Sequence, residues 1–264
     1  MDASVPARWN ALLDDVADYL QFMKEEGQKQ IEGASDILQA KRSGIVPPRG
    51  GESTVTLGRA SSPSEPPPPL PASEAKGDGL DAIAQQVAAC RLCGLCETRN
   101  QTVPGQGNPR PELIFVGEGP GADEDAQGLA FVGRAGQLLT KMIEAMGLTR
   151  DEVWIGNIVK CRPPNNRVPT PEEMASCMPY LKQQIALLQP KVMVCLGATA
   201  VKGLLDTKIG ITKLRGQWME FEGIATMPTY HPAYLLRNPP AKKFVWEDLK
   251  AVLARLGRTV PTAG

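Results

Sequence analysis

The sequence predicts an α/β fold in which helices cover both faces of a parallel β-sheet. Short apolar runs have the length and composition of buried parallel strands, at 113–116, 153–159, 192–196 and 224–227. Segments with apolar residues at helical spacing separate or follow these runs, at 138–146, 180–188 and 245–256. Strands that alternate with helices form parallel sheets covered on both faces, which is the basis of the prediction.

An amphipathic helix is predicted near the N-terminus. Apolar residues recur at helical spacing from Trp9 to Met23, and aspartates lie on the opposite face, at Asp14, Asp15 and Asp18. We assign residues 1–44 to this helical arm. We interpret it as a weakly docked or disordered arm, with docking to a protein partner as the alternative.

A proline-rich segment separates the arm from the α/β domain. Residues 45–79 contain eight prolines, four of them consecutive from Pro66 to Pro69, and few apolar residues. Such a composition cannot bury enough apolar surface to fold and predicts a flexible linker. The α/β domain then occupies residues 80–258, and residues 259–264 form a C-terminal tail.

Composition and charge limit the classes of function. The chain has 264 residues, 42% of them hydrophobic, and no run approaches the ~18 apolar residues of a membrane span. The first residues lack a signal-peptide pattern, so we expect a cytoplasmic protein with reduced cysteines and no membrane partner. The net charge is zero overall, but residues 1–79 carry −4 and residues 80–264 carry +4. The basic excess of the second part permits a nucleic-acid partner.

Cysteine spacing predicts a metal site. Two pairs stand out, Cys90-x-x-Cys93 and then Cys161 and Cys177, which fifteen residues separate. A Cys-x-x-Cys turn holds two thiolates close enough to bind one ion or cluster, and a second pair completes four ligands. His231 is the only histidine, so a four-ligand soft site must consist of cysteines.

Two further cysteines leave the ligand set open at this point. Cys195 lies inside an apolar run and is interpreted as a buried, inert thiol. Cys96 competes with Cys90 for pairing with Cys93. An all-cysteine site suits either zinc or a [4Fe–4S] cluster, and the spacing does not separate them.

Three of the four predicted strands lead into polar or glycine-rich loops, at 117–125, 157–167 and 229–237. The third strand leads only into Gly197, Ala198 and Thr199, which we interpret as a plain turn. Ligands of open parallel sheets bind beyond the carboxyl ends of the strands. The three loops should therefore face one cleft.

The side chains in these loops, and Phe131 after the first of them, have ordinary structural interpretations as well as functional ones. The Asn157 amide could cap a strand or read the edge of a base, and Phe131 could pack in the core or stack on a planar ligand. His231 follows a predicted strand and precedes a proline, which favours a functional histidine. Gly119 and Gly121 allow close approach of a ligand to the backbone. Their common cleft favours the functional interpretation.

Three long motifs resemble those of a known family. They are GEGPG at 117–121 followed by FVGRAG at 131–136, NIVKCRPPNNR at 157–167, and HPAYLLRNP at 231–239. These resemble the signatures of the family 4 uracil-DNA glycosylases, the iron–sulfur type found in bacteria and archaea. The resemblance covers roughly Cys90 to Leu256.

The resemblance implies a three-layer α/β/α sandwich with a central four-stranded parallel sheet, and a [4Fe–4S] cluster in place of zinc. The family's second ligand is followed two positions on by Leu and six on by Arg, and Leu95 and Arg99 match this spacing after Cys93. Cys96 is then a bystander. The implied ligands are Cys90, Cys93, Cys161 and Cys177.

The implied reaction is hydrolysis of the N-glycosidic bond that joins a flipped uracil to DNA, the first step of base excision repair. The resemblance implies His231 as a catalytic residue. Glu124 is our second catalytic candidate, for polarising water, with shaping of the pocket against the methyl group of thymine as the alternative. The implied uracil-binding residues are Glu118, Gly119, Gly121, Phe131, Asn157 and His231. The candidate DNA contacts are Arg162, Arg167, Leu235, Leu236 and Arg237, where a leucine would wedge into the gap that the base leaves.

We expect a monofunctional enzyme that acts as a monomer on uracil-containing DNA. One alternative is a catalytically weak, cluster-bearing DNA-binding or polymerase-associated subunit of the same fold. Another is a zinc-stabilised nucleotide hydrolase of unrelated chemistry.

Overall fold

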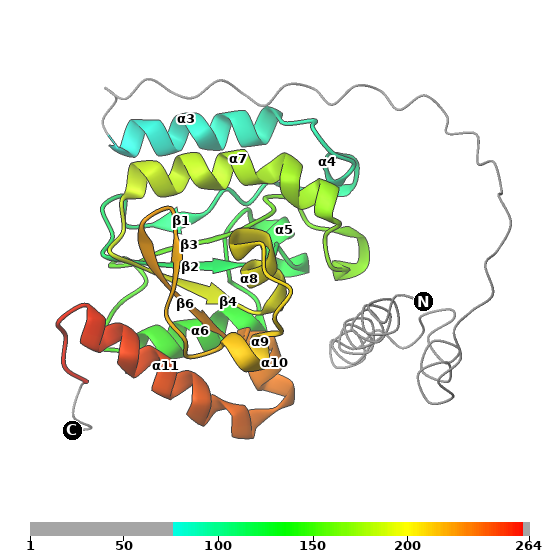
Figure 1. Ribbon diagram of the computed structural model, residues 1–264. Coiled ribbons are helices and arrows are strands. Elements are labelled where there is room, and N and C mark those ends of the chain that lie inside the picture. The colour runs from blue at the N-terminus through cyan, green and yellow to red at the C-terminus, as the bar shows by residue number, and fades with distance from the viewer. Residues whose placement is uncertain (1–75, 261–264) are drawn as a thin grey trace, which may run out of the picture. The chain divides into compact units, whose positions relative to one another are not determined.

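The computed structural model describes residues 76–260, which form the predicted three-layer α/β/α sandwich (Figure 1). The predicted arm at 1–44, most of the predicted linker at 45–79 and residues 261–264 lie outside the described residues. The first described helix begins at Lys76, inside the segment that we assigned to the linker. Within residues 76–260, no helix has both the length and the apolar character needed to cross a membrane.

The sheet of the described residues has six strands in the order β1-β3-β2-β4-β6-β5. The four central strands are parallel, as the resemblance implied, and a short antiparallel strand lies at each edge. The edge strands were not predicted. The strands are β1 (Gln106–Gly107), β2 (Leu113–Gly117), β3 (Trp154–Asn157), β4 (Val192–Leu196), β5 (Met219–Phe221) and β6 (Ile224–Thr229).

The helices connect the strands and cover both faces of the sheet. They are α3 (Lys76–Ala89), α4 (Leu95–Thr98), α5 (Ala122–Gln127), α6 (Arg134–Ala145), α7 (Pro171–Leu188), α8 (Ala198–Leu205), α9 (Ile211–Leu214), α10 (Pro232–Arg237) and α11 (Lys242–Arg255), with 3₁₀ turns η1 (Pro164–Asn166) and η2 (Pro239–Ala241). Helix α7 begins well before the predicted position because Thr170 and Glu173 form a capping box around Pro171.

Two hydrophobic cores lie on opposite faces of the sheet, because successive strand residues point to opposite sides. On β2, Phe115 belongs to the core under α6 and α11, whereas Ile114 and Val116 belong to the core under α7 and α8. Helix α3 packs on the outer side of α7 through Ile83, Val87 and Tyr180. Figure 1 shows α3 and α7 above the sheet and α6 and α11 below it.

The carboxyl ends of the parallel strands all meet at one edge. The arrows of β2 and β4 in Figure 1 point toward α5 and α8, which follow those strands. Strand β2 ends at Gly117, β3 at Asn157 and β6 at Thr229. The fold therefore brings the three motif-bearing loops to the same edge of the sheet, as the sequence predicts.

Candidate active site

Asn157 presents a buried amide oxygen at the end of β3. Its side chain is 1% exposed, and its Oδ1 has no hydrogen-bond partner among the described residues. A Cβ atom on Gly117, the β2 residue paired with Asn157, would lie 2.6 Å from that oxygen and 2.5 Å from Cζ of Phe131. Gly117 thus leaves a space open next to both the amide of Asn157 and the ring of Phe131. A buried acceptor without a partner costs about 1–3 kcal/mol, so a ligand that donates a hydrogen bond fits this position.

Phe131 has an unusual backbone conformation that two charged side chains hold in place. Its φ of +52° lies in the left-handed region, which is uncommon for a bulky residue. The Oε1 atom of Glu124 accepts the next two backbone N–H groups at 2.9 Å each. The guanidinium of Arg150 donates to the Phe131 carbonyl at 3.1 Å and to the preceding carbonyl at 2.8 Å. The loop is therefore held on its N–H side and on its C=O side.

Glu124 has one further contact within its own loop. Its Oε2 atom accepts the N–H of Gly121 at 3.1 Å, which closes the first turn of α5. Three of the roughly four lone-pair positions of the carboxylate are thus occupied by backbone donors. One position on Oε2 is left for a water molecule.

His231 caps the first turn of α10, and this contact determines which ring nitrogen carries the proton. Its Nδ1 accepts the N–H of Ala233 at 3.1 Å, so the neutral ring carries its proton on Nε2. Burial, and then the charge of Arg237, lower the pKa of His231 to about 4. The half-buried ring is therefore a neutral donor at neutral pH. Its centroid lies 5.7 Å from that of Phe131.

Gly197 leaves space beside His231, and Gly119 leaves space beside Val159. A Cβ atom on Gly197, which has a φ of +90°, would lie 2.9 Å from the Cβ of His231. One on Gly119 would lie 2.6 Å from Cγ2 of Val159. Gly197 belongs to the turn that we interpreted as plain, and the structure instead places it directly against the histidine.

The two leucines that we predicted as wedges have different surroundings. Leu235 is 1% exposed and packs in the core under α11, so it cannot insert into DNA in this conformation. Leu236 is 37% exposed, and its insertion into the gap that the base leaves stays a prediction. Their burial differs because neighbouring residues of α10 point to different sides of a helix.

The three predicted phosphate contacts also differ. Arg162 is only partly exposed, and its Nε donates to Asn166 Oδ1 at 2.7 Å. Arg167 forms a bidentate ion pair with Glu173 at 2.6 and 2.7 Å, so its guanidinium already has a partner at the start of α7. Arg237 lies in the last turn of α10. The interactions of these arginines with DNA remain predictions.

Five of the six cysteines line one pocket together with residues of α3 and α7, and all described cysteines are free thiols. The pocket cysteines are Cys90, Cys93, Cys96, Cys161 and Cys177. No three of the described Cys, His, Asp or Glu side chains lie close enough together to hold a metal ion as they stand. The pocket nevertheless contains all four predicted ligands, and Cys195 lies apart from it in β4, as predicted.

The pocket also provides hydrogen bonds to sulfur. The backbone N–H of Lys160 donates to Cys177 Sγ at 3.3 Å, and Arg99 donates to Cys161 Sγ at 3.0 Å. Such donors, together with the positive charge of Arg99, stabilise thiolates that ligate a cluster. Burial raises the pKa of Cys93, Cys161 and Cys177, so these thiols are protonated at neutral pH and would release their protons on binding a metal cluster. This donor set fits an all-cysteine metal cluster.

Two residues at the site were missed by sequence reasoning. Gly117 stood in a motif without an assigned role. Arg150 lies outside the motifs, and the carbonyls that it contacts are nineteen and twenty residues away in sequence. No local pattern of residues identifies such contacts.

Comparisons with known proteins agree with this geometry. A family model described as the uracil DNA glycosylase superfamily matches residues 104–250. A type-4 uracil-DNA glycosylase of Sulfurisphaera tokodaii is 47% identical over an alignment of 185 residues, which covers 66% of this chain and 84% of the relative. Those of Thermotoga maritima and Archaeoglobus fulgidus are 46% identical (65% of this chain, 91% of the relative) and 42% identical (70% and 97%). The chain belongs to the uracil-DNA glycosylase superfamily and, within it, to the type-4 family.

Proposed function

We propose that this chain is a monofunctional uracil-DNA glycosylase, which hydrolyses the N-glycosidic bond between uracil and deoxyribose in DNA and leaves an abasic site. The observation that carries the proposal is the buried, unpaired Oδ1 of Asn157 beside the ring of Phe131. The printed names of the relatives support the same activity. Such an enzyme initiates base excision repair on uracil-containing DNA.

The base-binding step uses two side chains. The flipped uracil stacks on the ring of Phe131, and the amide of Asn157 pairs with its edge. Uracil carries a donor at N3 and an acceptor at O4, so Oδ1 accepts the N3–H while Nδ2 donates to O4. This contact gives the unpaired oxygen its donor. We assign the other side of the pocket to the backbone around Glu118, Gly119 and Gly121.

The bond-breaking step leaves negative charge on the departing base. The N1–C1′ electron pair moves onto uracil, and O2 shares the charge. Because Nδ1 of His231 is occupied by the Ala233 N–H, the proton on Nε2 is the one available to O2. A preorganised donor of this kind stabilises the transition state by ~2.7–4 kcal/mol. A neutral imidazole does this without having to release a proton.

Water completes the reaction by adding to C1′ of the oxocarbenium-like sugar. The water loses a proton as its oxygen forms the new C–O bond, and uracil leaves as an anion that solvent protonates. The remaining lone-pair position on Glu124 Oε2 is the acceptor that we assign to this water. The same carboxylate holds the loop of Phe131.

We further propose that Cys90, Cys93, Cys161 and Cys177 hold a [4Fe–4S] cluster. Cys96 lines the same pocket, but Leu95 and Arg99 match the spacing that follows the second ligand of the family. Cys93 is then the second ligand, which favours Cys90 over Cys96 as the first. When bound, the cluster supplies a covalent tie between the Cys90–Cys93 turn, the loop after β3 and helix α7. The loop after β3 directly follows Asn157, so the tie would support the base pocket.

The test is cleavage of an oligonucleotide that carries a single uracil, followed by alkali, beside a thymine-containing control. Strand breakage at uracil alone is the expected result, and Asn157→Ala should lose most of it. The visible absorbance of the brown protein verifies that the cluster is present in both samples. Absence of breakage by the cluster-loaded protein would overturn the proposed activity and favour a DNA-binding subunit.

A further inference from the structure

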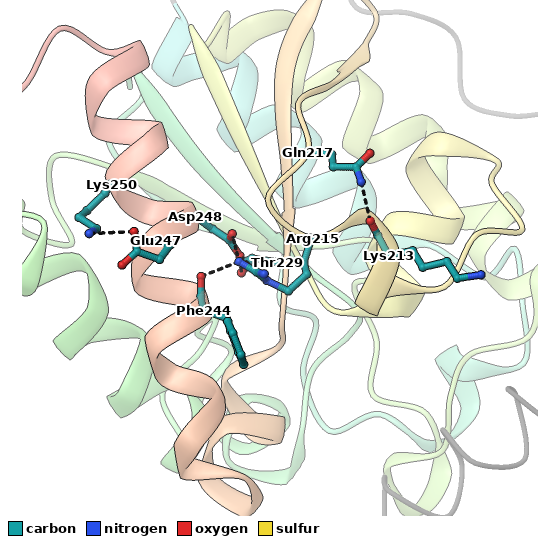
Figure 2. Close-up of polar contacts among 8 residues, drawn as sticks. All are labelled: Lys213, Arg215, Gln217, Thr229, Phe244, Glu247, Asp248 and Lys250. Carbon is teal, nitrogen blue, oxygen red and sulfur yellow. Dashed lines mark hydrogen bonds and ion pairs between the residues drawn. The ribbon is translucent and has the colours of Figure 1, made fainter.

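A buried ion pair lies beside the site but outside its motifs. Asp248 of α11 is 2% exposed, and Arg215, the residue after α9, donates to both of its carboxylate oxygens. The hydroxyl of Thr229 donates to Oδ2 of the same carboxylate at 2.6 Å. Figure 2 shows Arg215 pointing at α11 between Asp248 and Phe244, with Thr229 next to the pair. Three elements, α9, β6 and α11, therefore meet at one carboxylate.

The network ends two residues before His231. Thr229 is the last residue of β6, and its carbonyl accepts the N–H of Gly197 at 2.9 Å, the glycine that lies against the histidine. The guanidinium of Arg215 lies 5.9 Å from the ring centre of Tyr230, the residue between Thr229 and His231. The side chains of Thr229 and Tyr230 thus hold the segment before His231, in addition to the hydrogen bonds of the strand.

The turn that carries Arg215 is shaped for this contact. Gly216 has a φ of +74°, and a Cβ atom there would lie 2.7 Å from Oδ1 of Asp248. Its N–H donates to the carbonyl of Pro228 at 3.1 Å, which joins the turn to the end of β6. The backbone of the turn is therefore fixed against both the strand and the carboxylate.

Stability alone is a weak explanation for this arrangement. Desolvating two charges costs about as much as their attraction returns, so well-packed apolar residues often replace such pairs without loss. Buried pairs do, however, impose a specific geometry. Here that geometry belongs to the strand end that delivers the histidine.

We propose that Asp248, Arg215 and Thr229 are positioning residues, which fix the end of β6 so that His231 keeps Nδ1 on the Ala233 N–H and directs Nε2–H into the base pocket. The catalytic consequence rests on the proposed function. The orientation of the ring does not, so it can be measured separately.

The chain offers a matched pair of variants. Thr229→Val removes the hydroxyl that reaches Asp248, whereas Thr226→Val makes the same change at another fully buried threonine of β6 whose hydroxyl only contacts the Ile224 carbonyl. His231 is the only histidine, so a tag-free, cluster-loaded protein labelled with ¹⁵N-histidine gives the ring signals of one residue. These signals report directly which ring nitrogen is protonated.

The expected result is a single Nε2–H tautomer in the wild type and in Thr226→Val, and a mixture in Thr229→Val. In the same variant kcat should fall between about 10- and 100-fold with KM nearly unchanged, as for a misplaced catalytic group. Asp248→Asn, which keeps an acceptor for Thr229 but weakens the contact with Arg215, should show a smaller change in the same direction.

Two outcomes would overturn the proposal. One is an unchanged tautomer in Thr229→Val and Asp248→Asn, whatever happens to their thermal stability. The other is an equal effect of Thr226→Val on tautomer and kcat, which would reflect general loosening of the strand. If the wild type does not excise uracil, the tautomer measurement still decides the positioning role, and only the proposed function fails.

Discussion

The loop of Phe131 and the loop of His231 meet with their rings 5.7 Å apart, yet the protein holds them by different means. Arg150 holds the first loop by donating to backbone carbonyls, opposite Glu124, which accepts backbone N–H groups. Arg215 holds the second through a buried carboxylate that also accepts the Thr229 hydroxyl. One loop is fixed by hydrogen bonds from side chains to its own backbone, and the other by an ion pair between two other parts of the chain.

This difference predicts how the loss of each arginine should affect the protein. Without Arg150, two carbonyls lose a donor, but each can turn toward water as the loop relaxes. Without Arg215, a carboxylate with 2% exposure loses its counter-charge and cannot easily reach solvent. The first loss should therefore act mainly on the local conformation of Phe131, and the second on the whole domain.

The largest effect is expected for Arg215→Met. Leaving the Asp248 carboxylate buried and unpaired should lower the free energy of unfolding by about 3–5 kcal/mol, measured by urea unfolding of the cluster-loaded protein. Adding Asp248→Asn should recover much of this loss, because the amide carries no charge and still accepts the Thr229 hydroxyl. A single variant that costs less than about 1 kcal/mol would contradict a buried, charged pair.

The parts of the fold that sequence predicts best are those whose residues are uniformly apolar. Strand β4 was predicted with its observed bounds because all five of its residues are buried. Strand β6 extends two residues beyond its predicted end, to Thr229, which is polar but fully buried and whose hydrogen bond to Asp248 the sequence does not reveal. The edge strands β1 and β5 have only two and three residues, too few to establish a period.

In the candidate site, too, contacts between residues distant in sequence could not be predicted. Asn157, Phe131 and His231 could be predicted to converge because strand ends in a parallel sheet share an edge. Arg150 could not be, since it contacts carbonyls nineteen and twenty residues away, and backbone groups leave no mark in the sequence. Asp248 and Arg215 are thirty-three residues apart, on elements whose adjacency depends on the complete fold.

Glu124→Gln tests the N–H side of the Phe131 loop. Glutamine keeps one carbonyl oxygen for the two N–H groups that follow Phe131, but it places an amide nitrogen where Oε2 would accept from Gly121 and water. We expect kcat to fall by ~10²-fold with much less change in uracil binding, as measured by single-turnover kinetics and binding to a non-cleavable substrate. A variant within a few-fold of wild type would limit Glu124 to holding the loop.

Arg150→Met tests the carbonyl side of the same loop. We expect a loss of about 1–3 kcal/mol in unfolding free energy, and a larger KM for uracil-containing DNA because Phe131 leaves its left-handed conformation. The matched control is Arg134→Met, since Arg134 is an exposed arginine at the start of the next helix. Equal losses in both variants would show that Arg150 has no special role, and a loss as large as that of Arg215→Met would remove the contrast between the loops.

The smallest effect on activity is expected from a change of pH, which acts on His231 and Asp248 in opposite directions. Burial, followed by the charge of Arg237, depresses the pKa of this histidine to about 4. A depressed pKa means that its contribution to stability is present above the unfolded value of about 6.5 and is lost as the pH falls through the folded value. Asp248 behaves oppositely, because burial raises its pKa, so acid does not oppose folding through this carboxylate.

The activity should follow the protonation of His231 alone. We expect kcat/KM to stay nearly constant from about pH 5 to pH 8 and to decline toward pH 4, in step with the NMR titration of the single histidine. An acid limb centred near pH 6.5 would mean that the ring is solvated and free to charge, and it would contradict a neutral donor held against Phe131.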